Sequence, residues 1–129
     1  MKTKVATVQL EPDNSDNNQI IEINSTSIRL KTGQQNLPCL ITPIIIKELS
    51  FSRINNISEP EILLIKELQP EVIIIGTGKN QLWPESPLRR LIIEHKLPIE
   101  FMSNKTAAST FNLISTENRN VVCLLLLDD

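Results

Sequence analysis

The amino-acid sequence predicts an α/β fold, in which a mostly parallel sheet is covered by helices on both faces. From residue 58 onward, segments with the helical spacing of apolar residues alternate with short apolar runs, as in chains that form parallel sheets. Two of these runs, 72–75 and 121–127, show no apolar–polar alternation, which is typical of strands buried on both faces. The first third instead carries short strand patterns separated by turn residues, and it predicts an added β-hairpin layer at one edge.

Length and composition define the broad class of protein. The chain of 129 residues suits a single domain, and 40% hydrophobic with 22% charged residues is typical of a soluble globular protein. The formal charge is −2, and the aromatic residues are one Trp and three Phe, with no Tyr. Because nucleic-acid-binding domains need a basic surface and aromatic stacking platforms, we expect no nucleic-acid partner.

The chain is expected to begin with an arm that precedes the folded domain. Residues 1–19 end in a polar, turn-rich stretch and are interpreted as a flexible arm with a short edge strand at 5–10. Residues 20–129 then form one α/β domain. It comprises a β-rich part at 20–46 and an alternating helix–strand part at 58–127.

The β-rich part is expected to contain several short strands. The elements are strands at 20–24 and 26–31, a turn at 32–35 and an extended stretch at 37–46. Pro38 and Pro43 lack the amide hydrogen that a sheet ladder needs. The strand that contains them is therefore predicted to lie at a sheet edge or to bend.

In the alternating part, capping residues and prolines mark the helix ends. Ser58 and Glu61 form a capping box, and the helix that follows ends before Pro70. Pro87 opens the next helix, whose inner face ends on His95. The expected inner face of the first helix consists of Ile62, Leu64, Ile65 and Leu68. The remaining elements are strands at 72–75, 97–102 and 121–127 and a helix at 104–116.

Cysteine usage and hydropathy favour a cytoplasmic protein. Residues 1–19 hold no apolar run as long as that of a signal peptide, and the apolar run at 121–127 is about a third of a membrane-spanning helix. Cys39 and Cys123 lie in apolar segments and are expected to be buried thiols, with a disulfide, a metal site or a nucleophile as alternatives. His95 is interpreted as half-buried rather than as a catalytic base. Because no Cys-x-x-Cys motif occurs and His95 has no ligand at metal-binding spacing, we expect no metal and no cofactor.

Gly76-Thr77-Gly78 is the strongest candidate for a ligand site, and it contains two of the three glycines in the chain. It follows a buried strand, at the end where ligands bind in open α/β sheets. Glycines allow positive φ and let a backbone amide approach an anion, and Lys79 adds a positive charge. The stretch lacks the further glycine of dinucleotide-binding turns. A structural tight turn and a small-ligand or anion site are therefore both open.

The helix at 104–116 supplies further polar candidates. Thr110 and Asn112 are expected either to bond to neighbouring loops or to line a pocket whose floor is the glycine turn. The full candidate pocket consists of Gly76, Thr77, Gly78, Lys79, Asn104, Thr110, Asn112 and Arg119. Trp83 either packs against the sheet or anchors a protein partner, and with Phe111 it forms the candidate partner surface.

Three stretches together resemble the motifs of one protein family. They are Pro-Glu-Val-Ile-Ile-Ile-Gly-Thr-Gly-Lys-Asn-Gln-Leu-Trp-Pro at 70–84, Met-Ser-Asn-Lys-Thr-Ala-Ala-Ser-Thr-Phe-Asn at 102–112 and Glu-Asn-Arg at 117–119. In this order they resemble a family of small α/β proteins of largely unknown function. That family includes the mitochondrial NADH dehydrogenase (complex I) assembly factor 3 and the adipogenesis-associated domain proteins. The resemblance covers residues 20–126.

The resemblance implies a fold of three layers, with a mixed central sheet flanked by helices and an added β layer. Ser103-Asn104 stands where Asp-Thr is common in the family, Ser109 where Arg is frequent and Asn118 where Gly is usual. The missing arginine weakens the argument for anion binding. The family has no established catalytic residues, so the resemblance assigns none to this chain.

Three functions follow as hypotheses. The leading one is a non-enzymatic protein-binding or assembly factor with an unidentified protein partner. The alternative is a small-molecule or anion-binding protein that uses the glycine turn and the helix at 104–112, with or without weak enzymatic activity. The third is a structural subunit of an oligomer that pairs through the strand at 121–127. The sequence leaves the oligomeric state open.

Overall fold

Two β-sheets organise the protein in the computed structural model, which describes residues 6–7 and 16–128. The strands are β1 (Ala6–Thr7), β2 (Glu22–Ile23), β3 (Ser27–Leu30), β4 (Gly33–Asn36), β5 (Cys39–Ile41), β6 (Ile46–Glu48), β7 (Val72–Gly76), β8 (Ile99–Met102) and β9 (Val121–Leu125). The smaller sheet has the order β1-β2-β3-β4 and is antiparallel throughout. The larger sheet has the order β6-β5-β9-β7-β8.

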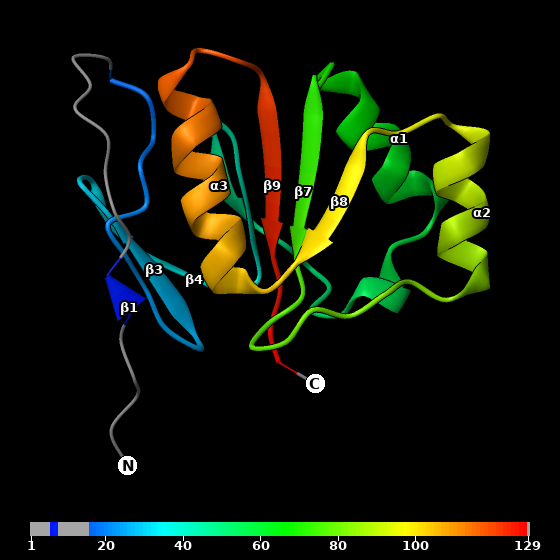
Figure 1. The fold of residues 1–129 in the computed structure, drawn as a ribbon, viewed down its shortest axis with the longest axis horizontal. Helices are drawn as coiled ribbons and strands as arrows, with labels where there is room; N and C mark the ends of the chain where they lie inside the picture. Colours follow the sequence, from blue (N-terminus) through cyan, green and yellow to red (C-terminus); the bar gives the residue numbers. More distant parts are fainter. Residues whose placement is uncertain (1–5, 8–15, 129) are drawn as a thin grey trace.

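Helices and the smaller sheet cover the two faces of the larger sheet (Figure 1). The helical elements are the 3₁₀ helix η1 (Ile54–Asn56) and the helices α1 (Glu59–Glu67), α2 (Ser86–Glu94) and α3 (Asn104–Thr116). One apolar cluster joins α3 and the smaller sheet to the larger sheet, and a second joins η1, α1 and α2 to its opposite face. Ile74 of β7 belongs to the first cluster, whereas Ile73 and Ile75 belong to the second. Successive side chains of β7 thus point to opposite faces, which explains its unbroken apolar run.

The larger sheet is mixed, with two parallel and two antiparallel pairs of strands, so the prediction that it is mostly parallel is not confirmed. β7 runs parallel to β8 and β9, whereas β5 runs antiparallel to both β9 and β6. The helical crossovers after β7 and β8 produce the parallel pairs. The antiparallel pairs arise because residues 39–48 fold as a hairpin and add to the edge of β9.

The two prolines of the extended stretch lie outside the strands. Pro38 precedes β5 and Pro43 follows it, so neither removes a hydrogen bond from the ladder. β5 is an internal strand, so of the two predicted alternatives, an edge position or a bend, the structure shows the bend. The chain turns between β5 and β6, where Thr42 Oγ1 accepts the backbone N–H of Ile45 at 2.9 Å.

Local signals predicted the helix boundaries well. The backbone N–H of Ser58 donates to Glu61 Oε1 at 2.8 Å, which confirms the capping box before α1. α3 spans the predicted residues, and only Ile62 and Ile65 of α1 are buried. Leu64 is 59% exposed, contrary to the prediction. It lies two residues from Ile62, which is about 200° around a helix of 3.6 residues per turn, so it points away from the sheet.

Most of the predicted arm, residues 1–5 and 8–15, lies outside the described residues. Ala6 pairs with Ile23 across β1 and β2, within the range predicted for a short strand. The last residues assigned to the arm belong to the folded domain. The backbone N–H of Asn18 donates to the Pro43 carbonyl at 2.7 Å, and Gln19 Nε2 donates to the Asn112 carbonyl at 3.3 Å.

Candidate functional site

At the carboxyl ends of β7 and β8, the chain leaves the larger sheet toward opposite faces. After β7 the chain passes to α2 on one face, and after β8 it passes to α3 on the other face. In open α/β sheets, ligands bind at such switch points. The stretch Gly76-Thr77-Gly78 lies here, facing the start of α3 (Figure 1).

Asn104 fills the space beside the glycine turn. Its side chain is 7% exposed, and a β-carbon on Gly76 would collide with its Oδ1 atom. The same Oδ1 accepts the backbone N–H of Gly78 at 3.0 Å, while Nδ2 donates to the Leu126 carbonyl at 2.7 Å. Asn104 therefore joins the ends of β7 and β9 to the first turn of α3.

Thr77 and Gln81 organise the loop that follows β7. The hydroxyl of Thr77, a residue that is 3% exposed, donates to the Asn80 carbonyl at 2.6 Å and accepts the backbone N–H of Leu82 at 2.9 Å. Gln81 Nε2 donates to the carbonyl of Phe101 in β8 at 2.7 Å. The Thr77 hydroxyl and the Gln81 amide nitrogen are thus bonded within the protein.

An acidic side chain from the segment after β9 packs against Gly78. The φ of Gly78 is +96°, in the region that favours glycine, and a β-carbon there would lie 3.0 Å from the Asp128 Cα. Asp128 Oδ1 accepts the backbone N–H of Lys79. Sequence reasoning missed Asp128, because nothing in the order of residues places it beside a turn 50 positions earlier.

Three residues of the predicted pocket lie away from the turn. The hydroxyl of Thr110 donates to the Thr106 carbonyl at 2.8 Å, within α3. Asn112 is 1% exposed and bonds both the N–H and the carbonyl of Ile20 at 2.8 Å. The physical reason is length, since Asn112 is eight residues beyond Asn104 and thus about 12 Å further along the helix.

Arg119 lies at the opposite end of the sheet, before β9. Its Nε is 3.5 Å from Glu71 Oε2, next to the start of β7. It also lines a cavity of about 240 Å³ with Asn17, Pro43, Ile44, Asn118 and Asn120. Gly76, Thr77, Gly78, Lys79 and Asn104 are the members of the predicted pocket that the fold brings together.

The two residues of the predicted partner surface have opposite environments. Trp83 is 71% exposed, in the loop before α2. Phe111 is fully buried in the cluster between α3 and the two sheets, so the prediction that it lies on a surface is wrong. Its position three and four residues beyond Ala108 and Ala107 places it on the inner face of α3.

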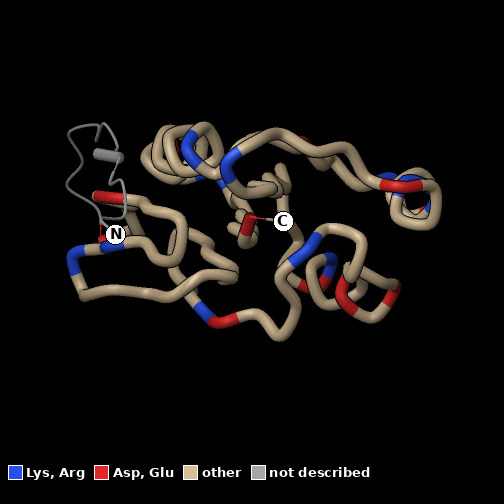
Figure 2. The backbone as a smooth tube through the Cα atoms, turned by 90° about the horizontal axis from the view of Figure 1, so that it is seen from below, with Lys and Arg blue, Asp and Glu red and all other residues tan. Residues whose placement is uncertain are grey.

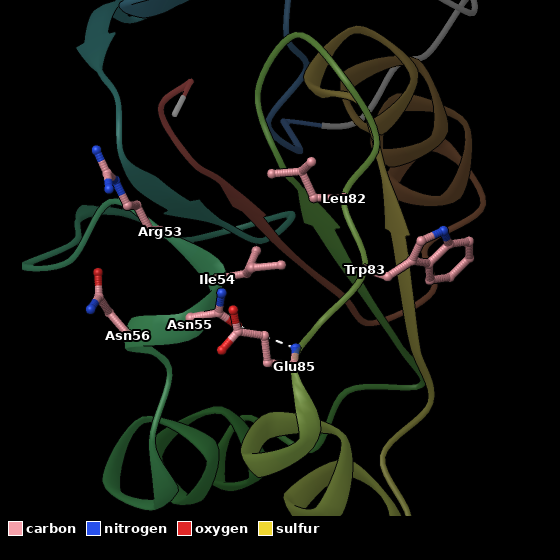
Figure 3. Close-up of a pocket in the computed structure, with 7 residues that line it drawn as sticks. All are labelled: Arg53, Ile54, Asn55, Asn56, Leu82, Trp83 and Glu85. Atoms are coloured by element: carbon pink, nitrogen blue, oxygen red, sulfur yellow. Dashed lines mark hydrogen bonds between the residues drawn. The ribbon is translucent and has the colours of Figure 1, made fainter.

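A cavity of about 410 Å³ lies next to the Trp83 loop (Figure 3). Its lining residues are Arg53, Ile54, Asn55, Asn56, Leu82, Trp83 and Glu85. In Figure 3 the indole of Trp83 points to the side of the loop away from Asn55 and Asn56. The ring therefore does not fill this cavity.

Charges are mixed around this end of the molecule. Figure 2 shows the backbone from the side of the strand carboxyl ends, with basic and acidic positions interspersed along its outline. Asp128 and Lys79 contribute one charge of each sign beside the glycine turn.

The two cysteines are buried, free thiols on neighbouring strands. Cys39 of β5 lies opposite Leu125, and Cys123 of β9 lies opposite Ile41. Burial raises the pKa of the Cys39 thiol to about 12. Burial, with a smaller contribution from Cys39, raises the pKa of the Cys123 thiol well above its ordinary value. Both therefore stay protonated and unreactive at neutral pH.

His95 lies among charged side chains that sequence spacing did not reveal. Glu59, Glu94 and His95 each offer one side-chain atom that could bind a metal ion, and these three atoms lie within 4.8 Å of one another. Lys66 Nζ is 3.3 Å from His95 Nδ1, and His95 Nε2 is 3.5 Å from Glu59 Oε2. These contacts join α1 to the end of α2.

Comparison with known proteins places the chain in a family. The family model that matches residues 20–126 is described as a protein of unknown function (DUF498/DUF598). The chain belongs to this family. This confirms the resemblance predicted from the three sequence motifs.

Two curated relatives extend the comparison. The chain is 33% identical over 99 residues to the "13 kDa major membrane protein" of Francisella tularensis subsp. holarctica (strain LVS), which covers 75% of this chain and 80% of that protein. It is 30% identical over 95 residues to "NADH dehydrogenase [ubiquinone] 1 alpha subcomplex assembly factor 3" of Drosophila melanogaster. That match covers 69% of this chain and 47% of the relative, so the chain spans about half of the assembly factor.

Solved structures share the fold. A crystal structure of a Bordetella parapertussis protein matches with a TM-score of 0.75 and 23% identity, over 89% of this chain and 99% of that one. A solution structure of a Mth938-like domain from Bordetella pertussis matches with a TM-score of 0.69 and 18% identity, over 94% and 92% of the two chains. The α/β fold of this chain is thus that of Mth938-like domains. Within the described residues, no helix has both the length and the apolar character needed to cross a bilayer.

Proposed function

We propose that this chain is a non-enzymatic protein-binding or assembly factor that contacts its partner through Trp83 and the loop around it. The observation that carries the proposal is the 71% exposure of Trp83. Tryptophan is enriched among the residues that dominate binding energy at protein interfaces. An exposed indole that points away from Asn55 and Asn56 of the neighbouring cavity is suited to insert into a partner.

The loop that presents Trp83 is held in place on both sides. The backbone N–H of Leu82 donates to Thr77 Oγ1 at 2.9 Å, and that of Glu85 donates to Asn55 Oδ1 at 3.3 Å. Pro84 is buried between them. Because ordering a loose loop on binding costs free energy, a held loop favours the use of Trp83 as an anchor.

The family supports an assembly role. The Drosophila relative is named as an assembly factor, and the region that it shares with this chain includes most of the domain described above. We extend to this chain only the general property that its name implies, which is binding to protein partners during assembly.

Capture of partners by matched variants tests the proposal. Trp83→Ala is expected to weaken partner binding about 30-fold or more, because an interface hot spot contributes about 2 kcal/mol or more. Ile93→Ala is the control, since Ile93 is 75% exposed on α2 and lies outside the Trp83 loop. Both variants should keep the far-ultraviolet circular dichroism of the parent. Equal capture of the same partner by the two variants would refute a role for Trp83.

A cytoplasmic location is part of this proposal. The free, buried thiols of Cys39 and Cys123 suit a reducing compartment, where thiols persist. Fractionation of the native cells tests the location, with the protein expected in the soluble fraction. Retention in the membrane pellet after a high-salt wash would instead favour the location that the name of the Francisella relative suggests.

A further inference from the structure

The C-terminal segment places a carboxylate on the glycine turn. Asp128 Oδ1 accepts the backbone N–H of Lys79, and the Asp128 Cα packs against Gly78. We propose that the Gly78–Lys79 turn is a carboxylate-binding site, which Asp128 of the same chain occupies here and which a carboxylate ligand occupies when Asp128 leaves. This inference goes beyond the protein-binding role of Trp83, and the two can be tested separately.

The turn is shaped for an acceptor oxygen rather than for a cation. Its exposed donor is the N–H of Lys79, and the side chain of Lys79 adds a positive charge. The preceding N–H, that of Gly78, already donates to Asn104 Oδ1 at 3.0 Å. The Asn104 backbone N–H donates to the Gly78 carbonyl at 2.7 Å, which sets the direction of the peptide that carries the Lys79 donor.

The glycine at position 78 is needed for this approach. Any side chain there would overlap Asp128 Oδ1, and its φ of +96° also favours glycine. A carboxylate can therefore reach the backbone only because this position has no side chain. The same requirement applies whether the carboxylate comes from Asp128 or from a ligand.

Asp128 can leave the turn without disturbing the sheet. Leu126 is 1% exposed, and its N–H donates to the Gly76 carbonyl at 3.0 Å, which fixes the end of the buried segment. Asp128 itself is exposed. The backbone N–H of Leu127 also donates to the Ser52 carbonyl at 3.2 Å, so a rotation of the chain after Leu127 would free the Lys79 amide while β9 remains in place. The site therefore has an internal competitor with a high effective concentration.

Amide chemical shifts of the Asp128→Ala variant test the proposal. In this variant, sodium acetate is expected to shift the ¹H–¹⁵N signals of Gly78 and Lys79 in a saturable manner. The parent chain should need at least about ten times more acetate for the same shift, because Asp128 competes within the molecule. Asp128→Asn should respond between the two, since its side-chain carbonyl still accepts a hydrogen bond. Sodium chloride at matched ionic strength controls for screening.

Two capped dipeptides distinguish the sources of the carboxylate. Acetyl-Ala-Asp-amide represents an acidic side chain of a protein partner, and acetyl-Ala-Asn-amide is its neutral control. Stronger binding of the Asp dipeptide than of acetate supports a peptide ligand, whereas the reverse supports a small carboxylic acid. Signals of Val121–Leu125 verify that each variant keeps its fold. The absence of a saturable shift with every carboxylate in both folded Asp128 variants would overturn the proposal.

Discussion

Gly78 and Asn104 exchange two hydrogen bonds across the carboxyl ends of β7 and β8. The Asn104 backbone N–H donates to the Gly78 carbonyl at 2.7 Å, and the Gly78 N–H donates to Asn104 Oδ1 at 3.0 Å. This reciprocal pair fixes the glycine turn relative to the first turn of α3. The first turn of α3 contains no acidic residue. It lies close to the larger sheet because the Asn104 side chain bonds to the segments that follow β7 and β9.

Removal of this amide is expected to destabilise the protein. Asn104→Ala leaves the Gly78 N–H and the Leu126 carbonyl without partners, and an unsatisfied buried polar group costs about 1–3 kcal/mol. We expect a loss of about 2–4 kcal/mol in the free energy of unfolding, measured by urea denaturation. The neighbouring exposed Lys105→Ala serves as the control and should change stability by less than about 0.5 kcal/mol.

Gly76 should tolerate no side chain. The β-carbon of Gly76→Ala would collide with Asn104 Oδ1 and lie 2.9 Å from Leu125 Cδ2 and 3.2 Å from Ala107 Cβ. Overpacking of this kind costs about 1–3 kcal/mol, which should appear as a lower melting temperature. Gly33→Ala is the matched control for a glycine without close neighbours, although its φ of +136° adds local strain. A Gly76→Ala protein as stable as the parent would contradict the close contact described here.

Asn112 is expected to hold the smaller sheet against α3. Asn112→Ala removes both hydrogen bonds to Ile20, so local opening of residues 20–23 should become easier than global unfolding. Hydrogen exchange of the Ile20 and Ile23 amides should accelerate by at least about tenfold, while exchange in β7 changes less. Leu113→Ala, at an exposed neighbouring position, should leave these rates unchanged.

The buried thiols make stability fall at alkaline pH. The pKa of Cys39 is raised from 9.0 to about 12 in the folded protein, and that of Cys123 is raised as well. Below pH 9 both states keep the thiol protons, so this contribution to stability is complete. Above pH 9 the unfolded state releases protons that the folded state retains, and stability falls until about pH 12.

Urea denaturation between pH 8 and 11 measures this effect. Each retained proton contributes a slope of at most about 1.4 kcal/mol per pH unit. The chain has no Tyr to titrate in the same range, which simplifies the comparison. Cys39→Ala should show a shallower decline than the parent, and an identical decline would refute the assignment to Cys39.

The sequence predicted elements whose signals are local and missed contacts that are distant. The bounds of α3 were predicted correctly, because its apolar spacing lies within the segment itself. The internal position of β5 was not predicted. A proline keeps a strand at a sheet edge only if it lies inside the hydrogen-bonded ladder, and Pro38 and Pro43 both lie outside it.

The candidate site shows the same division. The motif around Gly76 and Gly78 indicated a turn with close backbone approach, and other segments do pack closely against both glycines. It did not reveal which groups approach, because Asn104 and Asp128 come from α3 and from the segment after β9. Asn112 was predicted either to bond to neighbouring loops or to line a pocket, and its amide bonds to Ile20, whose position is set by the packing of the smaller sheet.

The hydrogen bond from Gln81 to Phe101 has a consequence for association between molecules. Met102 and Pro98 direct their carbonyls to β7, so Phe101 of the outermost strand β8 turns its backbone outward. An exposed strand of this kind is a template on which another chain can add a strand and start a fibre. Gln81 covers the Phe101 carbonyl, and the Ile99 N–H bonds back to the Leu97 carbonyl at 2.9 Å. The Gln81 side chain thus occupies one of the backbone acceptors that an added strand would need along β8.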